Sequence, residues 1–188
     1  MFDWLTHGEV LWFANRATGV VLIALLTLST AIGVFSTARA GSPRWPRFAT
    51  QALHRNVSLL TTAMLAVHIA SAVVDTYVNI RWWDALVPFL GLYSRLWLGL
   101  GTIASDLLIA VVITSLIRHR LNHRRWRIIH LLSYFGWLIG LVHGIGIGTD
   151  SATVWGLASS VLSVAVVAAF AGLRVATLLH ERRIEARL

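Results

Sequence analysis

The chain alternates long apolar runs with short segments that hold most of its charged side chains. A helix needs about 20 apolar residues to cross a bilayer, and five runs are long enough. They lie at 17–35, 51–74, 96–117, 128–147 and 152–179. The pattern therefore predicts an all-α integral membrane protein, in which residues 1–188 form a single five-helix transmembrane bundle.

The composition agrees with a chain whose solvent is mostly lipid. Hydrophobic residues make up 57% of it and charged residues 13%, and the mean hydropathy is +0.72. Cysteine is absent, which excludes thiolate metal sites, iron–sulfur clusters and c-type haem attachment. The net charge of +8 comes from arginine without any lysine. Because the arginines flank the apolar runs, we expect membrane lipid, and no nucleic acid, as the partner of this charge.

The arginines gather in alternate connections, which predicts the orientation of the chain. The basic segments follow the first, third and fifth runs and contain Arg39, Arg44, Arg47, Arg118, Arg120, Arg124, Arg125, Arg127, Arg182, Arg183 and Arg187. By the positive-inside bias these segments are cytoplasmic, so the N-terminus, with Asp3, is outside and the C-terminus is cytoplasmic. The segment 75–95, which contains Arg81-Trp82-Trp83-Asp84, predicts a short element at the outer interface.

Four histidines lie within the apolar runs in two pairs of similar spacing. His54 and His68 are 14 residues apart, and His130 and His143 are 13 apart. At about 1.5 Å per residue, each interval spans about 20 Å along a helix. Both runs cross from the cytoplasm to the outside in the predicted orientation, so they are parallel. This places His54 beside His130 and His68 beside His143, one pair near each face, and each pair is suited to clamp one haem iron.

The second interval is harder to place on one helix face. Fourteen residues return to within about 40° of the starting face, whereas 13 miss it by about 140°. We therefore expect the fourth run to twist or to be irregular near Gly136, Gly140 and Gly144, although these glycines could simply allow close helix packing.

Two stretches carry a resemblance to a known family. One runs from Thr114-Ser115 through Trp126, His130, Tyr134 and His143 to Gly148-Thr149-Asp150, and the other from Leu53-His54-Arg55-Asn56 to His68. They resemble the ferric reductase-like transmembrane domain, which is shared by ferric reductases, NADPH oxidases and the haem-binding membrane subunit of bacterial periplasmic methionine sulfoxide reductase. The resemblance covers roughly residues 12–150.

The resemblance implies two haem b groups bound through their iron. His54 and His130 would ligate the haem on the cytoplasmic side, and His68 and His143 the outer haem. Arg16 would face an outer haem propionate, as an arginine does in the oxidases, unless its guanidinium only extends to the water interface. Arg55 directly follows a predicted ligand and would either neutralise a propionate on the cytoplasmic side or act as a positive-inside anchor.

Two features depart from the family pattern. Members commonly carry a flavin and nicotinamide domain, but no G-x-G-x-x-G motif occurs in this chain. We therefore expect a separate flavin reductase or a membrane quinol as electron donor, with ferric iron or an extracytoplasmic protein as acceptor. Superoxide-producing oxidases have a further histidine one turn beyond the outer ligand, where this chain has Ala72. Oxygen reduction is therefore not the expected main task.

The sequence thus predicts a b-type cytochrome of a bacterial cell membrane, the electron-transferring membrane subunit of an oxidoreductase. One alternative is a stand-alone oxidoreductase in which quinone meets superoxide or oxygen at a haem edge. An alternative of another class is a haem-free transporter or structural membrane protein whose histidines bind protons or metal.

Overall fold

The computed structural model describes residues 9–37 and 46–185, which form helices and loops with no strand among them. Five long helices follow one another as α2 (Glu9–Thr37), α3 (Arg47–Val74), α4 (Arg95–Leu116), α5 (His123–Ile147) and α6 (Val154–Glu185). Two short 3-10 helices, η1 (Trp82–Ala85) and η2 (Arg118–Arg120), lie on either side of α4 in the chain. Asp3, Arg39, Arg44 and Arg187 lie outside the described residues.

All five long helices are apolar enough to cross a membrane. The predicted all-α architecture, with five helices long and apolar enough to span a membrane, is therefore confirmed. In their most apolar stretches, only 6% of the residues of α6 and 33% of those of α2 are buried inside the chain. An apolar surface this large is stable in a lipid solvent and would aggregate in water.

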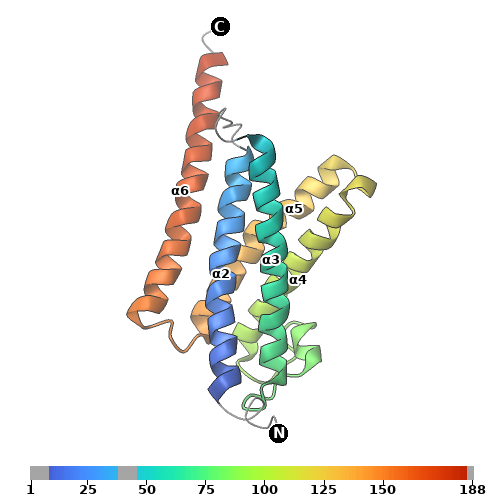
Figure 1. Cartoon of the computed structure of the whole chain (residues 1–188), viewed down its shortest axis with the longest axis vertical. Helices are drawn as coiled ribbons and strands as arrows, with labels where there is room; N and C mark the ends of the chain where they lie inside the picture. Colours follow the sequence, from blue (N-terminus) through green and yellow to red (C-terminus); the bar gives the residue numbers. More distant parts are fainter. Residues whose placement is uncertain (1–8, 38–45, 186–188) are drawn as a thin grey trace.

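The bundle is built from two antiparallel hairpins and a fifth helix. The pair α2 and α3 forms one hairpin, α4 and α5 the other, and α6 packs mainly on α2 (Figure 1). Between the hairpins lies a cluster of buried apolar side chains from α2, α3 and α5, namely Leu22, Leu26, Leu65, Trp137 and Leu141. The indole of Trp137 also donates a 3.0 Å hydrogen bond to the hydroxyl of Thr27, which joins α5 to α2.

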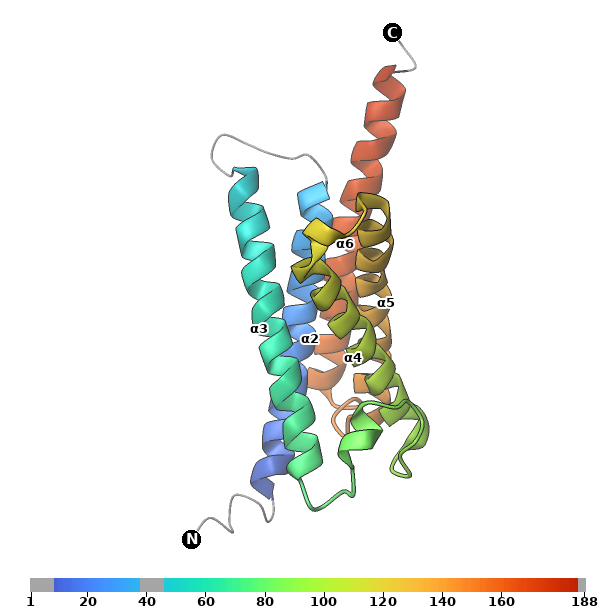
Figure 2. The same cartoon turned by 90° about the vertical axis from the view of Figure 1, so that its right-hand side faces the viewer.

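The helices α3 and α5 begin at the same end of the bundle and run in the same direction, as predicted (Figures 1 and 2). The expectation that α5 is irregular is wrong, because it is one continuous α-helix from His123 to Ile147. Figure 1 shows that α5 is inclined to α3. Between inclined helices, positions 13 residues apart can both lie toward the neighbouring helix without a distortion of the α-helix. Gly136 instead lies against Leu108 and Ala104 of α4, as a packing glycine does.

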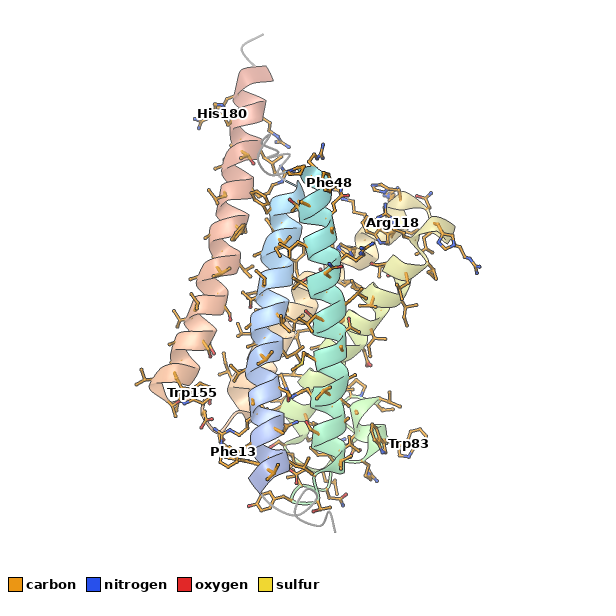
Figure 3. All side chains as sticks on the ribbon, in the orientation of Figure 1. Phe13, Phe48, Trp83, Arg118, Trp155 and His180 are labelled. Carbon is orange, nitrogen blue, oxygen red and sulfur yellow. The ribbon has the colours of Figure 1, made fainter. Side chains whose placement is uncertain are left out.

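The two ends of the bundle differ in their side chains. Arg118 lies at the same end as Phe48 and His180, whereas Phe13, Trp83 and Trp155 lie at the opposite end (Figure 3). The first of these ends holds the arginines of η2 and of the start of α5. By the positive-inside bias, the arginine-rich end is the one expected in the cytoplasm.

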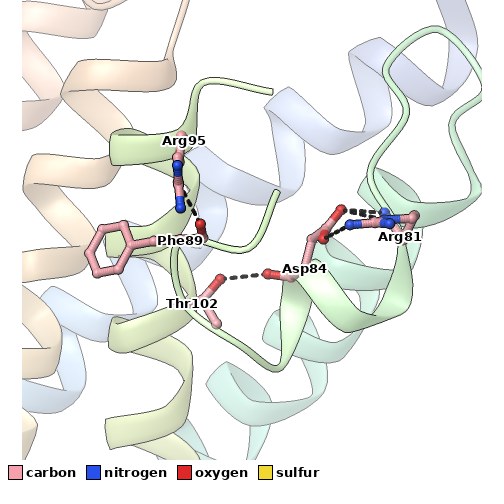
Figure 4. Close-up of polar contacts among 5 residues, drawn as sticks. All are labelled: Arg81, Asp84, Phe89, Arg95 and Thr102. Carbon is pink, nitrogen blue, oxygen red and sulfur yellow. Dashed lines mark hydrogen bonds and ion pairs between the residues drawn. The ribbon is translucent and has the colours of Figure 1, made fainter. Parts of the chain in front are cut away.

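The connection between α3 and α4 contains the predicted short element, which is the 3-10 helix η1. Its carboxylate, Asp84, is only 2% exposed and accepts hydrogen bonds from the amide and the guanidinium of Arg81, both at 3.0 Å (Figure 4). The hydroxyl of Thr102 in α4 donates to the carbonyl of Asp84 at 2.9 Å. These bonds fix the connection to the end of the bundle opposite Arg118.

Candidate functional site

The four predicted histidines project from α3 and α5 at two levels of the bundle, and all four are half-buried. We refer to His54 and His130 as the first pair and to His68 and His143 as the second pair. The first pair lies toward the arginine-rich end, because both residues are in the early turns of their helices. The second pair lies toward the end that holds η1.

The structure brings the first pair together. The ring centroids of His54 and His130 are 6.1 Å apart, with an interplanar angle of 74°. Trp126 stacks on His130, with ring centroids 4.9 Å apart. The indole Nε1 of Trp126 is buried and has no hydrogen-bond partner among the described residues. The first pair therefore lies beside an unsatisfied donor that an acidic ligand group could use.

The second pair lines a cavity of about 300 Å³. Its wall contains His68 and His143 together with Arg16, Asp150 and apolar side chains from all five long helices. A cavity of this size is at the lower end of the range for small-molecule and cofactor sites, about 300–1,000 Å³.

Three of the imidazoles make hydrogen bonds through Nδ1 to backbone carbonyls of a neighbouring helix. The acceptors are Ser29 O at 3.1 Å for His54, Asn15 O at 3.2 Å for His68 and Trp97 O at 2.7 Å for His143. A carbonyl oxygen only accepts, so these bonds require the proton on Nδ1. The lone pair of each neutral ring is then on Nε2, as a metal ligand needs.

His130 is held differently. Its Nδ1 lies 3.5 Å from the hydroxyl of Ser115, a long contact to a group that can donate or accept. The ring of His130 also stacks on Trp126 and contacts the ring of His54. The tautomer of His130 is therefore less constrained than that of the other three.

The two predicted arginines have different environments. Arg16 lies within α2, forms an ion pair with Asp150 and sits 4.0 Å from the ring centroid of Trp12. It is part of the wall of the cavity at the second pair, the position in which a propionate partner is expected. Arg55 is exposed on α3 next to His54, as an interfacial anchor would be.

The carbonyl acceptors on α2 and α4 were not anticipated from the sequence. One signal was present, since Asn15 and Ser29 are 14 residues apart, the interval that separates His54 from His68. No group of three or more His, Cys, Asp or Glu side chains in the described part of the chain is arranged to hold a bare metal ion. A haem needs only the two axial ligands from the protein, because the porphyrin supplies the equatorial nitrogens.

A family model described as a domain of unknown function (DUF8596) matches residues 10–150. The matched range contains all four histidines and ends before α6. No curated protein and no solved structure gives a match. The family description assigns no activity, so the geometry of the histidine pairs carries the functional argument.

Proposed function

The chain belongs to the DUF8596 family, and we propose that it carries single electrons across a membrane through two b-type haems. His54 and His130 are the axial ligands of one haem, and His68 and His143 are those of the other. The proposed resemblance to ferric reductase-like domains rests on the same residues.

The separation of the first pair is the observation that carries this proposal. Two imidazole nitrogens that are each about 2 Å from a shared metal are about 4 Å apart, which puts their ring centroids about 6 Å apart. The observed centroid distance of 6.1 Å fits that arrangement. A T-shaped packing contact between two rings falls in the same range, about 4.5–7 Å, so the measured haem content decides between the two interpretations.

Three further observations support the fit to a haem. The Nδ1 hydrogen bonds of His54, His68 and His143 leave Nε2 as the ligand atom. The buried Nε1 of Trp126 provides a donor for a haem propionate beside the first pair. The guanidinium of Arg16 provides a cation at the cavity of the second pair.

The residues of this chain would then bind, orient and insulate the cofactor. The inclined helices α3 and α5 hold the ligands at two depths, and the apolar side chains between the hairpins exclude water. A haem with two histidine ligands has no open coordination position and exchanges single electrons. Two such haems at different depths would divide the path across the apolar core of the membrane into shorter electron-transfer steps.

The arginine-rich end supports an assignment of direction. If that end is cytoplasmic, the first pair lies near the donor side and the second pair near the outer face. The donor would be a separate flavin reductase or a membrane quinol, and the acceptor ferric iron or an extracytoplasmic protein. The host membrane would be that of a bacterial cell.

Purification after expression in a haem-replete host tests the proposal. We expect about two haems per chain, a Soret band and b-type absorption in the reduced protein. The variants His119→Ala and His180→Ala are matched controls, because both residues are exposed, one in η2 and one in α6, and both should retain the full haem content. A wild-type chain without haem would contradict the proposal and favour a haem-free transporter or structural protein.

The cavity at the second pair favours a second candidate, a stand-alone oxidoreductase that reacts directly with a small molecule such as quinone, superoxide or oxygen. The reactant would enter this cavity beside the ion pair of Arg16 and Asp150, which is part of its wall. Stopped-flow mixing of the reduced protein with each oxidant separates the candidates, because a relay should reoxidise slowly without its protein partner.

A further inference from the structure

Three of the four imidazoles lie directly against a glycine of a neighbouring helix. A Cβ placed on Gly33 would be 3.3 Å from Cε1 of His54, and one on Gly19 would be 3.3 Å from Cε1 of His68. A Cβ on Gly101 would be 2.6 Å from Cε1 of His143. Contacts below 3.4 Å require the neighbour to move. Even a methyl group at any of these three positions would therefore displace the ring.

Each of these glycines stands four residues after the carbonyl that its histidine reaches. Ser29 precedes Gly33, Asn15 precedes Gly19 and Trp97 precedes Gly101 by this interval. In an α-helix the carbonyl of residue i points toward the amide of residue i+4. The absence of a side chain at i+4 thus opens the approach of the ring to that carbonyl. We call this pairing of a glycine with the carbonyl four residues earlier a glycine socket.

The recurrence of the socket on two helices argues against a packing coincidence. Both sockets of α2 receive histidines from α3, and the socket of α4 receives one from α5. A Cβ placed on Gly172 of α6 would meet nothing within 4 Å. This glycine, which lies away from the histidines, therefore does not share the socket geometry.

We infer that Gly19, Gly33 and Gly101 are positioning residues, which let a backbone carbonyl hold each histidine with Nε2 directed toward the iron. The inference rests on the proposed haem function and assigns the residues that orient its ligands. A carbonyl that accepts the Nδ1 proton also makes the imidazole a more basic ligand, which stabilises the ferric state. The sockets thus act on the reduction potential as well as on ring orientation.

His130 does not share this arrangement. Its Nδ1 faces the hydroxyl of Ser115 at 3.5 Å, and no described glycine is shown against its ring. The second pair therefore has two socketed ligands, and the first pair has one. Loss of a socket should affect the haem of its own pair and leave the other haem unchanged.

The test compares Gly33→Ala and Gly19→Ala with Gly172→Ala as a matched control, all in the purified full-length protein. Haem content, electron paramagnetic resonance of the oxidised protein and a potentiometric titration are measured for each. We expect each socket variant to shift the g-values of one low-spin signal and to raise one of the two potentials. Gly33→Ala should act on the first-pair haem and Gly19→Ala on the second, while the control changes neither.

Two outcomes separate this inference from the proposed function. If the wild type holds two haems but both socket variants keep its g-values and potentials, or shift both haems equally, the positioning role is wrong and the haem function stands. If the wild type binds no haem, the proposed function fails and the inference fails with it. Gly101→Ala should lose the second-pair haem, because its 2.6 Å approach leaves the least room.

Discussion

Trp126 stacks on His130, with ring centroids 4.9 Å apart and an interplanar angle of 23°. The guanidinium of Arg118 lies over the same indole, 5.2 Å from its centroid. The aromatic ring thus replaces the carbonyl contact that orients the other three histidines. This arrangement makes Trp126 the main support of the least constrained ligand.

Replacing Trp126 should therefore perturb one haem selectively. Trp126→Leu removes both the stacking surface and the indole N–H, so we expect a shifted low-spin signal and partial loss of the first-pair haem. Trp126→Phe retains an aromatic surface and should have the smaller effect. Electron paramagnetic resonance and haem content measure both, with the exposed Trp83→Phe as control. Equal behaviour of Trp126→Leu and the control would contradict the supporting role.

The pairing of the histidines predicts the result of single ligand removal. His143→Ala should remove the second-pair haem and leave part of the other, and His130→Ala should do the reverse. The haem content per chain should fall to half of the wild-type value or less in each variant, because each haem requires both of its axial ligands. Pyridine haemochrome spectra measure it. Loss of neither haem would show that the pairs are assigned wrongly.

The ion pair between Arg16 and Asp150 joins α2 to the connection between α5 and α6. Both side chains are partly exposed, so the pair should contribute no more than about 1 kcal/mol. Arg16→Asp should lower the melting temperature slightly, and the exchanged double variant with Asp150→Arg should recover part of the loss. Thermal unfolding in detergent at low and high salt measures this. A double variant less stable than either single one would contradict a direct interaction.

The connection around η1 should have a defined response to acid. Hydrogen bonds from the side chain and then the backbone of Arg81 lower the pKa of Asp84. Its contribution to stability is therefore complete above the unfolded-state pKa, about 3.9, and is lost as the pH falls through the lower folded-state pKa. Asp84→Asn should lower the melting temperature by a few degrees at pH 5–8 and by less below about pH 4. If the difference in melting temperature between the wild type and Asp84→Asn changed between pH 8 and pH 5, this assignment would be wrong.

The hydrogen bond from Trp137 to Thr27 lies between the two hairpins. Interhelical hydrogen bonds in membrane proteins contribute about 0.6 kcal/mol on average and up to about 1.7. Thr27→Val should destabilise the bundle by an amount in this range. Trp137→Phe should cost more, because it also leaves a cavity in the buried cluster. In a double-mutant cycle measured by unfolding in mixed micelles, the double variant should lose less stability than the sum of the losses of the two single variants. Simple additivity would show that the two groups do not interact.

Hydropathy locates all five spans but places several helix ends too far inward. The first predicted run begins at residue 17, whereas α2 begins at Glu9 and includes the polar residues Asn15 and Arg16. Asn15 donates to the carbonyl of His68 at 3.0 Å and to the hydroxyl of Ser71 at 3.1 Å. Because these partners are distant in sequence, a local hydropathy window cannot show that the polar groups are satisfied within a helix.

The site shows the same division between local and tertiary information. The similar intervals in the sequence identify the four histidines and predict their pairing. Both depend only on the position of each residue along its helix. The carbonyls of Ser29, Asn15 and Trp97 depend on how neighbouring helices are rotated, and a backbone acceptor has no signature in the sequence. The 13-residue interval wrongly indicates a helix distortion, because the relative inclination of α5 is a property of the whole bundle.

The fifth long helix, α6, supplies none of the four histidines and packs mainly on α2. The two hairpins therefore carry all four proposed ligands, whereas α6 contributes only part of the wall of the cavity at the second pair. Substitution of the α6 residues that do not line this cavity should consequently leave the histidine geometry intact, whereas a change in the inclination between the hairpins would alter it.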